Sequence, residues 1–360
     1  MDFYLTIAAL ILGFTFSNIT IPAILKVANA KNIFEPFEER RLHNSKVPPL
    51  GGIAVFAGFV LATVIASGNI ATLRFQAIFA ALLMLFLIGL KDDLINVRAY
   101  KKIIVQCFAA LLIVLLGKLR FTGLNGLFGF NELGFWTGLS FSVLFIVTVI
   151  NAFNLVDGID GLASGLAILA ATFLGSWFNM AGFAPFAIVS FALVGSLLGF
   201  FIYNVFSVKN KIFLGDTGSL VTGAIIAILL IRFINGTPKV TPLGLTASPA
   251  IAFAIICIPL IDTLRVVTIR ILLRQSPFTP DKNHIHHRLL QLMPNHGKVT
   301  GVLVATNLLF IIAAAFMTYS DVDINIQFFI LLTSGIILSF VPSWLLRARS
   351  SKKTLQTSKG

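Results

Sequence analysis

Charged residues are scarce in this chain. Only 11% of its 360 residues are Asp, Glu, Lys or Arg, whereas roughly a quarter are charged in soluble domains. Hydrophobic residues make up 57% of the sequence. This balance excludes an ordinary soluble domain and predicts a membrane protein that crosses the bilayer several times.

Cysteine is also rare. Cys107 and Cys257 both lie inside apolar segments, which excludes a disulfide framework and predicts two free thiols. The N-terminus has no basic region, and no small-residue cleavage pattern follows the first apolar run. We therefore expect that run to be a retained transmembrane helix rather than a signal peptide.

Long apolar runs fill most of the chain instead. They predict an all-α integral membrane protein, a polytopic bundle of about 11 transmembrane helices. We expect one membrane domain over residues 1–346 and a disordered basic tail over 347–360. The expected spans are 3–25, 51–67, 74–90, 103–117, 133–150, 162–178, 183–203, 218–232, 246–271, 299–318 and 325–345.

The basic residues between these runs are unevenly distributed. The net charge is +13, and 22 of the 27 Lys and Arg residues fall in the connections on one predicted side or in the tail. Because short cytoplasmic loops are enriched in Lys and Arg, this predicts an outside N-terminus, with the basic loops and tail in the cytoplasm. We interpret the charge as a topology signal and expect no nucleic-acid partner.

The stretch from Asn151 to Gly161 places polar residues between two apolar runs. Asn151, Asn154, Asp157 and Asp160 follow one another at intervals of three, so in a helix they form a slowly turning ladder. A buried Asp is costly in a membrane, which makes these residues functional candidates. The alternative is a polar clamp between helices, and it suits Asn151 best.

Two further acidic clusters fall on the predicted cytoplasmic side. Asp92 and Asp93 end one apolar run, and adjacent carboxylates suit a metal ligand or a general base. Lys102 begins the next run. Asp216 lies in a Gly-Asp-Thr-Gly-Ser turn at an expected helix N-terminus, where Mg²⁺ with a bound phosphate would fit. Solvated loop charges and a helix N-cap are the structural alternatives.

Basic and histidine-rich loops on the same side suit anionic ligands. Lys46 precedes Pro48-Pro-Leu-Gly-Gly52, whose backbone amides suit a phosphate; a membrane anchor is the alternative. The loop Asp281–Arg288 holds His284, His286, His287 and Arg288. These side chains suit diphosphate or sugar contacts better than zinc, because no cysteine is near. Together the clusters predict a cytoplasm-facing active-site cleft.

The order of these motifs resembles the polyprenyl-phosphate N-acetylhexosamine-1-phosphate transferases, also called glycosyltransferase family 4. The resemblance covers nearly the whole membrane region. The histidine pattern His-Ile-His-His-Arg is similar to the WecA/TagO branch, whereas the related MraY branch has three consecutive histidines. The matching segments are Pro48–Gly52, Gly89–Asp93, Lys102–Gln106, Asn151–Gly161, Phe213–Asp216 and the histidine loop.

The resemblance implies an enzyme of the bacterial cytoplasmic membrane. It would transfer N-acetylhexosamine-1-phosphate, most simply GlcNAc-1-phosphate, from a UDP-N-acetylhexosamine to undecaprenyl phosphate, a membrane lipid, and release UMP. This would be the first membrane step of a cell-envelope polysaccharide pathway. Mg²⁺ would be the cofactor, with Mn²⁺ as a substitute, and a homodimer is a further expectation.

The resemblance also implies roles for single residues. Asn154 and Asp216 would hold the metal, and Asp92 or Asp93 would deprotonate or orient the lipid phosphate. The expected substrate-binding residues are Lys46, Lys102, Asn151, Asp157, Asp160, His284, His286, His287 and Arg288. An MraY-like MurNAc-pentapeptide phosphotransferase is one alternative. An ion-coupled transporter is another, although its polar residues would lie near the bilayer midplane within inverted repeats.

Overall fold

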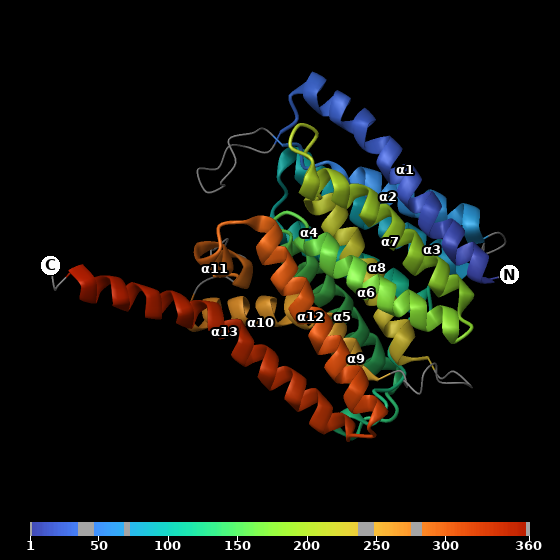
Figure 1. Ribbon diagram of the computed structural model, residues 1–360. Helices are drawn as coiled ribbons and strands as arrows, with labels where there is room; N and C mark the ends of the chain where they lie inside the picture. Colours follow the sequence, from blue (N-terminus) through green and yellow to red (C-terminus); the bar gives the residue numbers. More distant parts are fainter. Residues whose placement is uncertain (1, 35–46, 68–72, 237–247, 275–282, 358–360) are drawn as a thin grey trace.

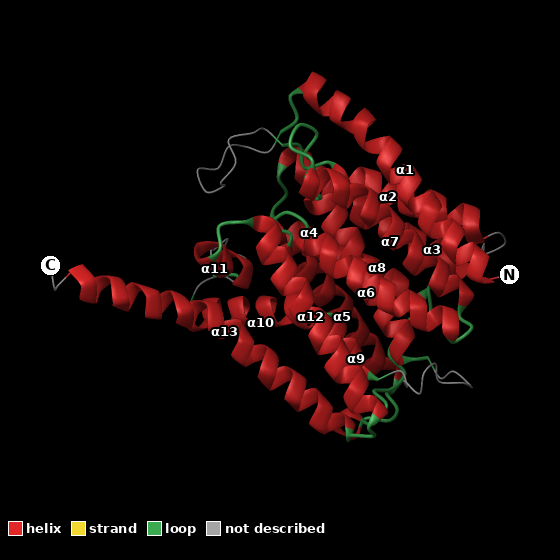
Figure 2. Ribbon diagram, in the orientation of Figure 1, coloured by secondary structure: helices red, strands yellow, loops and turns green. Residues whose placement is uncertain are grey.

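The computed structural model describes residues 2–34, 47–67, 73–236, 248–274 and 283–357. These residues form helices joined by loops, and none of them is in a strand (Figure 2). In chain order the helices are α1 (Asp2–Lys31), α2 (Gly51–Ser67), α3 (Leu73–Ile95), α4 (Ala99–Leu115), η1 (Leu127–Gly129), α5 (Phe135–Val156), α6 (Leu162–Met180), α7 (Ala184–Phe201), η2 (Ile202–Phe206), α8 (Gly215–Ile234), α9 (Pro249–Ile255), α10 (Cys257–Leu272), α11 (Ile285–Leu292), α12 (His296–Tyr319) and α13 (Ile324–Thr357).

The all-helical, polytopic prediction agrees with this structure. Among the described residues, seven helices are long and apolar enough to cross a membrane, or up to eight if the bent pair α9–α10 is one span. Every range expected to span the bilayer overlaps a helix. The chain is therefore a multi-pass membrane protein, because helices satisfy their own backbone hydrogen bonds in lipid.

Helix α8 forms the centre of the bundle. All of its residues are buried except Gly215, Asp216 and Arg232, and it packs against α2, α3, α5 and α6. Small residues let the neighbouring backbones approach it closely: a Cβ on Gly52 would lie 2.1 Å from the backbone nitrogen of Gly218. The buried position of α8 fixes where its N-terminus, with Asp216, can lie.

The expected span 246–271 is broken. Helices α9 and α10 meet at Ile256 with a bend of 77°. Asn307 on α12 compensates for the break, because its side chain accepts a hydrogen bond from the Ile258 amide at 3.1 Å and donates one to the Ile255 carbonyl at 2.9 Å. A buried break is tolerated in a membrane when its free backbone groups find such partners.

The periphery of the bundle includes α1 and α13, the two candidate spans whose apolar surfaces are the most exposed (Figure 1). Pro342 lies inside α13, and Figure 1 shows this helix changing direction on its way to the C terminus. The helix extends to Thr357, which differs from the disordered tail expected from residue 347. The reason is local: residues 347–357 contain no glycine or proline, so nothing stops the preceding helix.

Candidate active site

The N-terminus of α8 is held by Asp93 from the end of α3. One carboxylate oxygen of Asp93 accepts a hydrogen bond from the Asp216 amide at 2.7 Å. The other accepts bonds from the Thr217 amide at 2.9 Å and the Thr217 hydroxyl at 2.5 Å. The first amides of a helix have no partner within the helix, so Asp93 acts as their cap.

Asp92, its neighbour in sequence, makes different contacts. Its Oδ1 accepts a bond from the Val97 amide, and its Oδ2 accepts one from the Lys102 ammonium at 2.9 Å. The same ammonium lies 2.7 Å from Oδ2 of Asp216. The Lys102 ammonium thus bridges carboxylates from α3 and α8, two helices that are far apart in the sequence.

Asn154, near the end of α5, completes this cluster. Its Nδ2 donates to Oδ1 of Asp216 at 3.0 Å and to the Ser219 hydroxyl at 2.9 Å. Four of the predicted residues therefore contact one another directly: Asp92, Lys102, Asn154 and Asp216. We call these four residues the carboxylate cluster.

The Pro48–Gly52 segment positions the loop in front of Asp216. The Gly51 and Gly52 amides donate to the carbonyls of Phe213 and Leu214, each at 2.8 Å, and the Phe213 amide donates to the Pro48 carbonyl at 3.0 Å. Gly215 adopts φ +71°, and a Cβ there would lie 2.2 Å from the Pro49 carbonyl oxygen. Two motifs about 160 residues apart thus form one backbone unit. Lys46 lies outside the described residues.

The turn after α5 is fixed by side chains from three other elements. The Gly161 amide donates to Asn204 of the π-helix η2 at 2.7 Å, and the Thr300 hydroxyl donates to the Asp160 carbonyl at 2.7 Å. Asp160 Oδ2 lies 2.7 Å from the Lys211 ammonium and 2.8 Å from Nδ1 of His296. Burial alone would raise the pKa of Asp160, but hydrogen bonds from His296 and Lys211 outweigh it and hold the pKa below its usual range.

Helix α11 brings the histidines to this turn. A Cβ on Gly158 would lie 2.3 Å from Nε2 of His286, so the ring rests against the glycine backbone. His286 is buried, and neither of its ring nitrogens has a hydrogen-bond partner in the described structure. Burial lowers the pKa of His286 to about 3, against the opposing charge of Asp262. The rings of His284 and His287 lie 5.5 and 4.3 Å from it, centroid to centroid.

The remaining predicted residues are placed as follows. Asp157 is the C-cap residue of α5, directly after Val156. The Arg288 guanidinium donates to the Asn283 side chain at 2.6 Å, within the histidine loop. Asn151 donates to Gln106 on α4 at 2.6 Å and to the Val147 carbonyl at 2.8 Å. The side chain of Asn151 therefore joins α4 to α5, which is the geometry of a polar clamp.

Sequence reasoning missed four residues of this region: Lys211, His296, Asp262 and Arg265. A signal existed for Asp262 and Arg265, because charges inside an apolar run are functional candidates by default. Both are buried, and both contact residues of the histidine loop. No signal existed for Lys211 and His296, whose partner Asp160 is 51 and 136 residues away.

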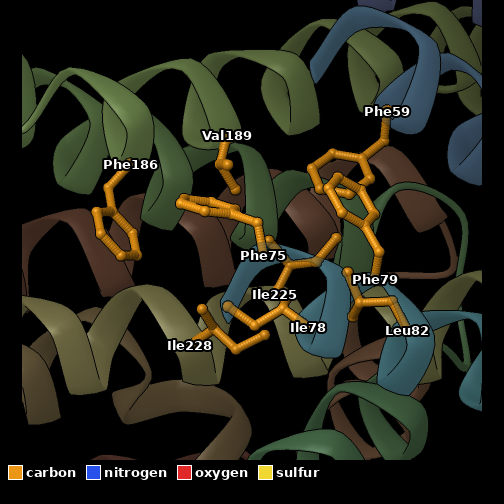
Figure 3. A pocket seen from close by; sticks show the side chains of 9 residues that line it. All are labelled: Phe59, Phe75, Ile78, Phe79, Leu82, Phe186, Val189, Ile225 and Ile228. Atoms are coloured by element: carbon orange, nitrogen blue, oxygen red, sulfur yellow. The ribbon is translucent and has the colours of Figure 1, made fainter. Parts of the chain in front are cut away.

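An apolar pocket lies apart from these polar residues. Figure 3 shows its lining, which comes from α2, α3, α7 and α8 and contains no polar side chain. None of the predicted site residues borders it. The lining residues are Phe59, Phe75, Ile78, Phe79, Leu82, Phe186, Val189, Ile225 and Ile228.

Comparison with known proteins identifies the family. The model of glycosyl transferase family 4 matches residues 75–234, a range that holds the whole carboxylate cluster. A probable undecaprenyl-phosphate N-acetylglucosaminyl 1-phosphate transferase of Bacillus subtilis (strain 168) is 33% identical over 310 residues, which are 85% of this chain and 84% of that protein. The chain belongs to glycosyl transferase family 4.

Two further relatives with similar names match the chain to a similar extent. The undecaprenyl-phosphate alpha-N-acetylglucosaminyl 1-phosphate transferase of Escherichia coli (strain K12) is 31% identical over 77% of this chain and 74% of its own length. The protein of that name from Salmonella typhi is 32% identical over 81% of this chain and 78% of its own. The resemblance seen in the motifs is thus confirmed over most of the chain.

Proposed function

We propose that this family member transfers N-acetylglucosamine 1-phosphate from UDP-GlcNAc to undecaprenyl phosphate and releases UMP. The observation that carries the proposal is the carboxylate cluster, which joins α3, α4, α5 and α8 at one end of the bundle. The relatives support the sugar, because their names specify N-acetylglucosaminyl 1-phosphate transfer to undecaprenyl phosphate.

The location of the site suits an acceptor that stays in the membrane. The cluster lies at helix ends, where a phosphate headgroup can meet a water-soluble nucleotide while the polyprenyl chain remains in lipid. We propose that this end of the bundle faces the cytoplasm of a bacterial cell, with the N-terminus outside. Eleven spans, the cleft and a homodimer belong to the same proposal.

The cluster fits a divalent metal such as Mg²⁺. Mg²⁺ prefers oxygen ligands and is held in many enzymes by one or two carboxylates together with substrate phosphates. Asp216 and Asn154 would hold it, and the Lys102 ammonium between Asp216 and Asp92 marks this position as one where a positive charge is stabilised. When bound, the metal would neutralise charge on the diphosphate.

The other residues have roles that follow from their contacts. Asp92 is the better candidate to deprotonate or orient the lipid phosphate, because it shares the Lys102 ammonium with Asp216, whereas the carboxylate of Asp93 caps α8. Lys102 would bind phosphate oxygens. An oxygen of the lipid phosphate attacks the β-phosphorus of the donor, the bond to the bridging oxygen breaks, and UMP leaves, without a covalent enzyme intermediate.

The turn 157–161 and α11 would bind the donor. Asp157 and Asp160 would shape the nucleotide pocket, and the histidines with Arg288 would contact the sugar and diphosphate. The ring of His286 supports this placement, because it packs against Gly158 and so joins α11 to the turn.

The proposal is tested with purified protein in detergent, UDP-GlcNAc, undecaprenyl phosphate and Mg²⁺. We expect the wild-type protein to release UMP only when both substrates and the metal are present. The Asp216→Ala variant should release no UMP although its melting temperature equals that of the wild type. Full activity of the Asp216→Ala variant would remove Asp216 from the metal site. UMP release with UDP-MurNAc-pentapeptide as the donor, but not with UDP-GlcNAc, would instead favour the MraY-like alternative.

A further inference from the structure

Two of the buried charges on helix α10 contact the start of the histidine loop. Asp262 and Arg265 lie three residues apart, hence on neighbouring faces of the helix, and are 2% and 8% exposed. Arg265 donates to the Asn283 carbonyl at 2.6 Å and to the Ser339 carbonyl of α13 at 3.1 Å. Asp262 Oδ1 accepts a bond from the Ile285 amide at 2.9 Å. Charged side chains at such depth are costly, so a role beyond packing is expected.

The second oxygen of Asp262 contacts the ring of His284. Oδ2 of Asp262 lies 3.0 Å from Nδ1 of His284, and both side chains are buried. A carboxylate only accepts hydrogen bonds, so Nδ1 must carry the hydrogen. A neutral imidazole protonated at Nδ1 has a lone pair on Nε2.

The ring of His284 belongs to the group of histidines that packs on the turn after α5. Its ring stacks on that of His286 at 5.5 Å and an interplanar angle of 16°, and His286 rests on Gly158 in the turn after α5. No side chain in the described residues hydrogen-bonds Nε2 of His284. Arg288 and the backbone amides supply donors for a diphosphate, whereas an amino sugar itself offers hydroxyl and amide hydrogens that need acceptors.

We propose that Asp262 is a positioning residue that holds His284 in the Nδ1–H form, so that Nε2 accepts a hydrogen bond from a hydroxyl or amide of the donor's N-acetylhexosamine. This inference rests on the proposed function. Asp262 never touches substrate. It sets the orientation of the ring and the location of its proton, and Arg265 fixes the backbone from which the ring projects.

The first test is a double-mutant cycle. Asp262→Asn keeps the size of the side chain and an acceptor for the Ile285 amide, but its NH₂ would donate to Nδ1 and leave the hydrogen on Nε2. We expect Asp262→Asn and His284→Gln each to lower kcat/KM for UDP-GlcNAc by about 10-fold or more, as loss of an oriented hydrogen bond does. In the His284→Gln background, Asp262→Asn should cost little more, because it acts through that ring.

The control cycle uses His287, a neighbouring ring other than the one whose Nδ1 Asp262 holds. The full effect of Asp262→Asn should persist in a His287→Gln background. If Asp262→Asn lowers kcat/KM by the same factor in the His284→Gln background, its role is structural and the inference fails. Wild-type protein that releases no UMP from UDP-GlcNAc would refute the proposed function instead, so the two failures are distinguishable.

A second measurement needs no variant of Asp262 and covers the case in which Asp262→Asn does not fold. The wild-type protein is labelled with ¹⁵N-histidine, and the His284 signals are assigned by their loss in His284→Gln. We expect a protonated Nδ1 and an unprotonated Nε2 at about pH 7.5. A hydrogen on Nε2 of His284 would overturn the inference whatever the kinetics show.

Discussion

At the scale of single residues, Asp92 and Asp93 are adjacent in the chain but make different contacts. The sequence indicates a pair of carboxylates and leaves open which one meets the lipid phosphate. The contacts separate them: Asp93 caps α8, and Asp92 faces Lys102. This distinction depends on the rotation of the last turn of α3 against α8, and no local pattern in the sequence reports it.

Substitution of each aspartate by asparagine should therefore give opposite results. Asp93→Asn removes part of the α8 cap and should lower the free energy of unfolding by about 1–2 kcal/mol, the usual worth of an N-cap. Asp92→Asn should leave the melting temperature nearly unchanged and lower kcat by about 100-fold or more, as expected for a general base. Thermal melts and UMP release in detergent measure both. The reverse pattern would assign the base to Asp93.

His286 should make stability depend on pH. Its pKa of about 3 lies below the ordinary value for histidine, so below about pH 6.5 the unfolded chain binds a proton that the folded protein does not. The contribution of His286 to the free energy of unfolding is therefore complete above that pH. It falls by about 2 kcal/mol between pH 6.5 and 5. We expect His286→Gln to flatten the fall in melting temperature over this window, and His287→Gln to leave it steep. Equal slopes in all three proteins would contradict the assignment.

At the scale of elements, the sequence predicts every spanning helix but not the break in 246–271. That run is continuously apolar, and the bend at Ile256 depends on Asn307, which lies about 50 residues later in another span. Broken helices occur in transporters, where free backbone groups bind ions. Here a side chain satisfies them, so the break does not favour the transporter alternative.

Removal of the Asn307 amide should destabilise this junction. Asn307→Leu leaves the Ile258 N–H and the Ile255 carbonyl buried without partners, each at a cost of about 1–3 kcal/mol. We expect a lower melting temperature in detergent together with weaker activity, because α10 carries the residues that hold the histidine loop. Thr306→Ala, at a half-buried neighbouring position on α12, is the matched control and should melt like wild type. An Asn307→Leu protein as stable as the control would show that the break is satisfied in another way.

At the scale of the whole molecule, the distribution of Lys and Arg predicts that one end of the bundle is cytoplasmic. The predicted clusters lie at helix ends and contact one another there, as the C-terminus of α3 and the N-terminus of α8 illustrate. The sequence could predict this grouping because topology alone puts those loops on one face. It could not predict the partners of Asp160, since contacts between loops depend on the packing of the entire bundle.

The orientation is testable with single cysteines in intact cells. Asn131 and Lys209 are both exposed and lie on opposite predicted faces. A membrane-impermeant maleimide should label Asn131→Cys in intact cells, and Lys209→Cys only after the cells are opened. Cys107 and Cys257 are replaced by alanine in both proteins, so that only the introduced thiol reacts. Labelling of Lys209→Cys alone in intact cells would invert the topology and place the site outside.

The central claim is that the bond formed is to the β-phosphorus of the donor, and the most direct measurement follows that atom. The protein is given UDP-GlcNAc labelled with ³²P in the β-phosphate, undecaprenyl phosphate and Mg²⁺, and the lipid is extracted. The account predicts that the label enters the lipid as a diphosphosugar while unlabelled UMP appears in water. Label that stays in water as UDP, with the sugar on the lipid, would contradict it, because the sugar alone would then have been transferred.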